Sequence, residues 1–148
     1  MRVRVYVSAM VLAWSGAVII AQAQKVTTPE QLDKVMKQVQ QANQPIGKQL
    51  ASGQYAEVRK GLAAVKENVL LSQSFWIEHK KDDAVKMNKE TIAKIEAVEK
   101  LVATDTVDVV AATTALKEVG GSCRACHKQY RETDAENNFI LKPGSIGG

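Results

Sequence analysis

Apolar residues return every three or four positions through most of residues 28–132. This spacing is the period of a helix with one buried face, whereas half-buried strands alternate every second residue. Four such segments follow one another with short connections, without an internal repeat or a low-complexity tract. The pattern predicts an all-α fold, and short connections favour an antiparallel four-helix bundle.

Local signals mark the ends of the first helix. The run Thr28-Pro29-Glu30-Gln31 predicts a capping box with proline at the first helical position. Pro45 predicts a kink or a short break, because proline has no N–H for the helical ladder. Ser52-Gly53 ends this interrupted helix.

The other boundaries have weaker signals. The second helix begins near Tyr55 and weakens at residues 72–74, so we expect Phe75-Trp76 to lie in a packed connection. Asp82 is the expected cap of the third helix. The fourth helix is expected over 106–132. Its valines and threonines also suit strands, but its apolar residues continue one helical face.

The start of the chain has the features of a secretory signal peptide over residues 1–23. Two arginines are followed by an apolar run at 7–20 and by the small-x-small sequence Ala21-Gln22-Ala23. An uncleaved N-terminal anchor is the alternative. Cleavage leaves one domain, residues 24–148, in which no later segment is apolar enough to span a membrane.

Removal of the two leader arginines lowers the net charge from +4 to +2. The mature chain has neither a concentrated basic stripe nor interleaved aromatic residues, so we expect no nucleic-acid binding. It has few aromatic residues for a core of its size, which suggests that something else fills the middle. Those residues are Tyr55, Phe75, Trp76, Tyr130 and Phe139.

Both cysteines lie in one short motif, Cys123-Arg124-Ala125-Cys126-His127. C-x-x-C-H is the covalent attachment motif of c-type haem. On a helix, positions i, i+3 and i+4 share one face. Two thiols can therefore form thioethers with the two vinyl groups of one haem while the imidazole of His127 reaches its iron.

The cysteine pair has three other possible interpretations, a redox pair, a zinc site and a disulfide. A thioredoxin-like redox pair normally lies in a βαβ unit, which the helical pattern does not provide. A structural zinc ion needs four ligands, and only His127 and the distant His79 could add to the thiols. A disulfide suits an exported chain. The histidine next to Cys126 favours haem over all three.

Taken together, the motif and the helices resemble the class II c-type cytochromes, the cytochrome c′ and cytochrome c556 group. The resemblance covers most of residues 28–132. Its specific carriers are Val35-Met36-Lys37, Phe75-Trp76 and the stretch from Cys123 to Arg131. It implies one covalent haem c on the C-terminal helix of the bundle, and many such bundles pair as homodimers through their first two helices.

The resemblance also implies roles for individual residues. Cys123 and Cys126 match the thioether positions, and His127 matches the proximal iron ligand. Arg131 matches an arginine near the proximal pocket, with a surface helix charge as the alternative. Met36 matches the distal position, which holds the sixth ligand in the c556 group and shields an open iron in cytochrome c′. Methionine is also common as core filler.

Several further positions bear on this expectation. Met87 is expected to pack at the haem edge, and His79 to lie in an exposed turn. Leu32 stands where cytochrome c′ tends to have an arginine, which argues against a polar gate at the distal site like that of cytochrome c′. Gly120-Gly121 either lets the backbone approach a flat ring or relieves crowding. The extension 133–148 is expected to fold back, because three adjacent apolar residues resist solvation.

Function is expected to follow from the cofactor. The first hypothesis is a periplasmic electron-transfer protein that serves redox partner proteins. The second is a five-coordinate binder of a diatomic gas, NO or CO. A peroxidase is the third, although it would want a distal acid–base residue. No nucleophile–base pair or paired carboxylates suggest catalysis, so we expect that the chain is not an enzyme.

Overall fold

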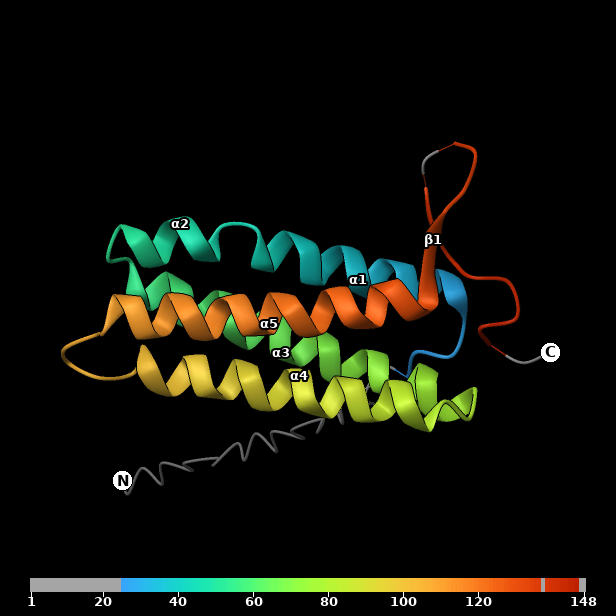
Figure 1. Cartoon of the computed structure of the whole chain (residues 1–148), viewed down its shortest axis with the longest axis horizontal. Helices are drawn as coiled ribbons and strands as arrows, with labels where there is room; N and C mark the ends of the chain where they lie inside the picture. Colours follow the sequence, from blue (N-terminus) through green and yellow to red (C-terminus); the bar gives the residue numbers. More distant parts are fainter. Residues whose placement is uncertain (1–24, 137, 147–148) are drawn as a thin grey trace, which may run out of the picture.

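The computed structural model describes residues 25–136 and 138–146, so the expected signal peptide lies outside the described residues. Long helices lying side by side form a bundle (Figure 1). The predicted helical bundle is therefore confirmed. The elements are α1 (Pro29–Asn43), α2 (Ile46–Ala51), α3 (Tyr55–Glu78), α4 (Asp82–Leu101), α5 (Val109–Tyr130), β1 (Arg131–Thr133) and β2 (Phe139–Leu141).

Successive helices of the bundle run in opposite directions, with α1 and α2 together taking the place of one helix (Figure 1). Close packing joins α1 to α3, α3 to α4 and α4 to α5. The helices α1 and α5 approach each other much less closely than these pairs do. In the described part of the chain, no helix combines the length and apolar character needed to cross a membrane.

The predicted ends of the first helix are confirmed. The backbone N–H of Gln31 donates to the Thr28 hydroxyl over 3.3 Å, and the Gln31 side chain accepts from the Thr28 N–H over 3.2 Å. The helix breaks between α1 and α2, and Pro45 stands at the N-cap of α2. Gly53 follows α2 with φ 73°, a left-handed conformation that glycine adopts without steric cost.

The prediction of a connection at Phe75-Trp76 is wrong, because α3 continues to Glu78. The polar residues before this pair do not break the helix. The Ser72 hydroxyl donates to the Val69 carbonyl oxygen over 2.7 Å, which satisfies it within the helix. Phe75 is fully buried and Trp76 is nearly so, with ring centroids 5.1 Å apart in an edge-to-face arrangement.

Two further boundaries differ from those expected. Asp82 is not a cap: Lys81 occupies the N-cap of α4 without a side-chain bond, and Asp82 is the first helical residue. The last helix spans Val109–Tyr130 rather than 106–132. It begins late because the Asp108 carboxylate accepts from the Ala111 N–H over 2.9 Å and so caps the helix there.

The core consists of two apolar clusters along the bundle. The first apolar cluster includes Ile46, Leu50, Val58, Leu62, Val65, Val69, Ile95, Val98, Val102, Ala112 and Val119. The second apolar cluster includes Val26, Leu32, Val35, Phe75, Trp76, Ala84 and Tyr130. Buried Asn88 of α4 donates to the Ser72 hydroxyl over 2.9 Å and to the Val69 carbonyl oxygen over 3.3 Å. This pair joins α3 to α4 by specific polar contacts.

The extension after α5 forms a small antiparallel hairpin, an element that the all-α prediction did not include. Arg131 pairs with Leu141, and the Lys142 N–H donates to the Tyr130 carbonyl oxygen over 2.9 Å. Leu141 packs against the second apolar cluster, so the expected fold-back is found at this residue. The two apolar residues before it stay exposed, so the expectation holds only in part. Phe139 and Ile140 are 52% and 39% exposed, and Figure 1 shows the hairpin projecting from the end of the bundle.

Candidate haem-attachment site

The cysteine motif lies in the last turns of α5, where helix geometry places Cys123, Cys126 and His127 on one side. All three side chains are half-buried. Cys123 packs against the first apolar cluster and Cys126 against the second. The motif thus lies where the two clusters meet, with its thiols directed toward apolar surroundings.

Both thiols are free. Burial raises the pKa of Cys123, and it raises the pKa of Cys126 from 9.0 to about 11, with smaller contributions from the charges of Cys123 and Asp83. A redox-active pair needs a lowered thiol pKa, because the thiolate is the nucleophile. These thiols instead stay protonated near neutral pH, which is unlike a thioredoxin-type pair.

The raised pKa predicts slow alkylation of Cys126 in protein made without haem. At pH 8 the thiolate fraction of a thiol with a pKa of about 11 is ~100-fold smaller than that of a thiol with a pKa of 9. Because the thiolate is the reactive form, the rate should rise as pH increases toward 11. Iodoacetamide labelling followed by mass spectrometry measures this rate, with urea-unfolded protein as the control. Fast labelling of the folded chain at neutral pH would instead indicate an activated redox thiol.

His127 has the protonation state that an iron ligand requires. Burial lowers the pKa of its imidazole, and the positive charge of Arg131 lowers that pKa further. The ring is therefore neutral at neutral pH, and a neutral imidazole nitrogen can bind a metal ion. Burial and the charge of Arg131 thus favour the neutral imidazole over its protonated form.

Arg131 is not a surface helix charge, because it leaves α5 in an extended conformation and begins β1. It is half-buried, and its guanidinium carbon lies 3.8 Å from the centroid of the Phe139 ring. Such a cation–π contact holds the positive charge in place. The hairpin therefore keeps Arg131 close enough to His127 to affect its pKa.

Met36 of α1 and Met87 of α4 both pack, half-buried, against the second apolar cluster, which Cys126 also contacts. The structure thus brings the candidate distal residue to the cluster that borders the attachment motif. Leu32, one turn before Met36, is buried in the same cluster. This position contributes packing rather than a polar group.

His79 lies in the turn at the end of α3, as expected, but the residue is half-buried rather than exposed. Its Nε2 lies 3.3 Å from the Thr27 carbonyl oxygen, to which it donates, and its ring centroid lies 4.3 Å from that of Phe75. Lys80 makes the turn after it with φ 54°. A histidine held in this way anchors the segment before α1 to the end of α3.

A polar contact beside the motif is not predicted by the sequence. The Gln129 side chain donates to the Asp83 carboxylate, and hydrogen bonding from Tyr130 lowers the pKa of Asp83. Tyr130 also packs on Trp76, with ring centroids 4.7 Å apart. Its place on the inner helical face was predicted, but the approach of Asp83 depends on how α4 packs against α5.

The glycine pair in α5 does not relieve crowding by backbone or core atoms. A Cβ atom added at Gly120 would lie 3.3 Å from Nη1 of Arg124, and one added at Gly121 would lie 3.9 Å from Nη2. In both cases the neighbour is the far end of a flexible side chain. Close approach of a flat ring stays a prediction for this pair.

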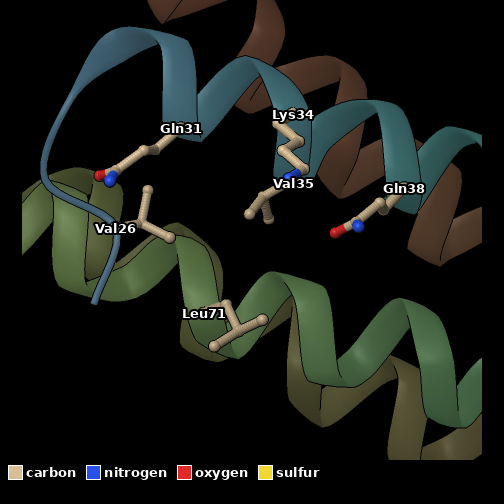
Figure 2. Close-up of a pocket in the computed structure, with 6 residues that line it drawn as sticks. All are labelled: Val26, Gln31, Lys34, Val35, Gln38 and Leu71. Atoms are coloured by element: carbon tan, nitrogen blue, oxygen red, sulfur yellow. The ribbon is translucent and has the colours of Figure 1, made fainter. Parts of the chain in front are cut away.

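A small pocket of about 80 Å³ lies between α1 and α3 (Figure 2). Figure 2 shows its six lining residues, Val26, Gln31, Lys34, Val35, Gln38 and Leu71. Cofactor pockets typically enclose about 300–1,000 Å³, so this one is too small for a porphyrin. It also includes no residue of the cysteine motif and is separate from the candidate site.

Within residues 25–136 and 138–146, no group of three or more His, Cys, Asp or Glu side chains is arranged to hold a metal ion. This finding argues against a structural zinc site, which needs four such ligands. A haem makes a different demand, because the porphyrin supplies four nitrogens and the protein only axial ligands. Comparison with protein-family models, characterised proteins and solved structures finds no match to this chain.

Proposed function

We propose that the mature chain is an exported, periplasmic electron-transfer protein with one covalent haem c. Cys123 and Cys126 form the two thioethers, and His127 is the proximal ligand. The observation that carries this proposal is the half-buried face of α5, on which two free thiols and an imidazole lie together where the two apolar clusters meet. Neither a redox pair nor a zinc site calls for this combination.

When bound, the haem supplies an iron that cycles between Fe(III) and Fe(II). The chain's own residues hold and tune it. Cys123 and Cys126, both on one helix, would hold the haem covalently, and His127 on the same face would bind its iron. The limited approach of α1 to α5 supports a ring position between these helices, because other helix pairs pack closely.

Met36 is the proposed distal ligand. It lies on α1, the helix that faces α5 across this loosely packed side, and it contacts the same apolar cluster as Cys126. A thioether is a soft ligand that favours the reduced iron and raises the potential. The apolar neighbours Leu32 and Val35 add to that effect, because they keep water from the ring.

Replacement of Met36 with alanine tests the ligand. Wild-type protein should be low-spin, with a sulfur-to-iron charge-transfer band in the ferric spectrum. Met36→Ala should be high-spin and should bind CO without displacing a ligand, because the sixth position is then open. Optical spectra of the ferric, ferrous and CO-treated forms make the measurement.

Met87→Ala is the matched control, since Met87 is a second half-buried methionine on the same cluster. It should leave the wild-type spectrum unchanged. An unchanged spectrum in Met36→Ala would disprove ligation by Met36. If the wild-type protein is itself high-spin and binds CO directly, the open-iron alternative holds, and gas binding replaces electron transfer as the proposed function.

A further inference from the structure

Charge is distributed unevenly among the long helices. Acidic and basic residues balance in α1 and α3, and acidic residues exceed basic ones in α4. In contrast, α5 carries three basic residues and one acidic residue. Its basic residues are Lys117, Arg124 and Lys128, all of them exposed. The helix that bears the cysteine motif is thus the one long helix with an excess of positive charge.

These three residues, which we call the basic face of α5, are spaced seven and four positions apart. That spacing places them on one stripe of a helix. The guanidinium of Arg124 lies back over Gly120 and Gly121, whose missing side chains leave room for it. Its charge is therefore shifted toward Lys117, which makes the face more continuous than the sequence suggests.

Three exposed lysines outside α5 have carboxylate partners within the protein. Lys25, Lys37 and Lys60 pair with carboxylates at 2.6–2.8 Å. Among residues 25–136 and 138–146, no ion pair involves the basic face. Lys128 lies in the last turn, where its positive charge interacts favourably with the helix dipole. Lys117 and Arg124 lie outside that turn. The helix dipole therefore explains the positive charge at Lys128 but not at Lys117 or Arg124.

We propose that the basic face of α5 docks an acidic redox partner protein. This inference rests on the proposed function, because electron transfer requires a partner close to the haem edge. Arg124 and Lys128 follow Cys123 and His127 in sequence and point about 100° away from them around the helix, so the basic face lies on the outer side of α5 next to the motif. A protein seated there lies within about one helix diameter (roughly 10 Å) of the attachment residues. A few exposed charges give fast, salt-sensitive association rather than a permanent complex, as a redox shuttle needs.

Oxidation kinetics of the reduced, haem-loaded protein test the field around the haem edge. The anionic oxidant is ferricyanide and the cationic one is tris(1,10-phenanthroline)cobalt(III), and both are strong enough to oxidise a haem of raised potential. Charge reversal of the basic face (K117E, R124E, K128E) should lower the ratio of the anion rate to the cation rate by about tenfold or more at low salt. The effect should largely disappear at about 0.5 M salt, where screening is strong.

A matched control reverses three exposed lysines on α4, Lys86, Lys89 and Lys100 (K86E, K89E, K100E). It makes the same change in net charge on a neighbouring helix. If this variant lowers the rate ratio as much as the α5 variant does, net charge explains the effect and the docking face is wrong. Neutral replacements (K117Q, R124Q, K128Q) should give an intermediate ratio, and circular dichroism should show wild-type helicity.

Binding measurements identify the class of partner. Poly-L-glutamate should bind the wild-type protein and the α4 control, and should bind the α5 variant at least about tenfold more weakly. Preferential binding to phosphatidylglycerol vesicles or to duplex DNA through the basic face would overturn an acidic protein partner. The same assay applies to colourless protein. If the haem proposal fails, the wild-type protein is colourless. If the docking proposal fails, the α5 variant binds poly-L-glutamate as strongly as the wild-type protein does.

Discussion

Protein in which Cys123 and Cys126 are both replaced with alanine is expected to lose covalent haem completely. Each thiol supplies one thioether, so removal of both leaves no bond from the chain to the ring. When produced with a cytochrome maturation system, the variant should have the mass of the processed polypeptide alone. Wild-type protein should retain the added mass of one haem after denaturation, which electrospray mass spectrometry measures directly.

The single variants make this result specific. Cys123→Ala and Cys126→Ala should each retain at most one thioether, with reduced yield of the red protein. Ser122→Ala is the control on the same helix, because its hydroxyl contacts Lys94 rather than an apolar cluster. It should be loaded like the wild type. Colourless wild-type protein, with its thiols free or joined to each other, would end the haem proposal.

Replacement of Phe75 with alanine is expected to cost about 3–5 kcal/mol in the free energy of unfolding. Phe75 is 0% exposed, and its ring packs against Trp76 and His79. The loss combines the transfer of the ring to water with the cavity that remains. Urea unfolding followed by circular dichroism measures the difference, with wild type and variant compared at the same haem content.

Ile77→Ala is the control for that measurement. Ile77 lies two residues further along α3 and is 60% exposed, so its truncation should change the free energy of unfolding by no more than about 0.5 kcal/mol. Equal effects at the two positions would mean that α3 does not bury Phe75. A cost near zero at Phe75 would mean that its ring is not buried in the second apolar cluster.

Local chemistry explains which parts of the fold are predictable from the sequence. The capping box at Thr28 and the break at Pro45 depend on a few neighbouring residues, and both are found. Ser72 was misread because its hydroxyl is satisfied by Val69 and contacted by Asn88, a residue of another helix. The hairpin beginning at Arg131 likewise depends on pairing with residues that follow a turn.

The candidate site divides in the same way. The shared face of Cys123, Cys126 and His127 follows from helix geometry within one segment, so sequence alone predicts it. The contact of Met36 with the same cluster as Cys126 depends on the packing of separate helices. The stripe of Lys117, Arg124 and Lys128 can be found from helix geometry, but the position of the Arg124 guanidinium over Gly120 and Gly121 depends on side-chain packing.

The buried amide of Asn88 has a consequence for how the bundle is aligned. If α4 slid by one turn along α3, this amide would lose the Ser72 hydroxyl and the Val69 carbonyl oxygen, its two acceptors. An unmatched buried amide is costly, whereas purely apolar surfaces tolerate many offsets. The Asn88 contact thus selects one register between the apolar faces of α3 and α4, which alone would allow several.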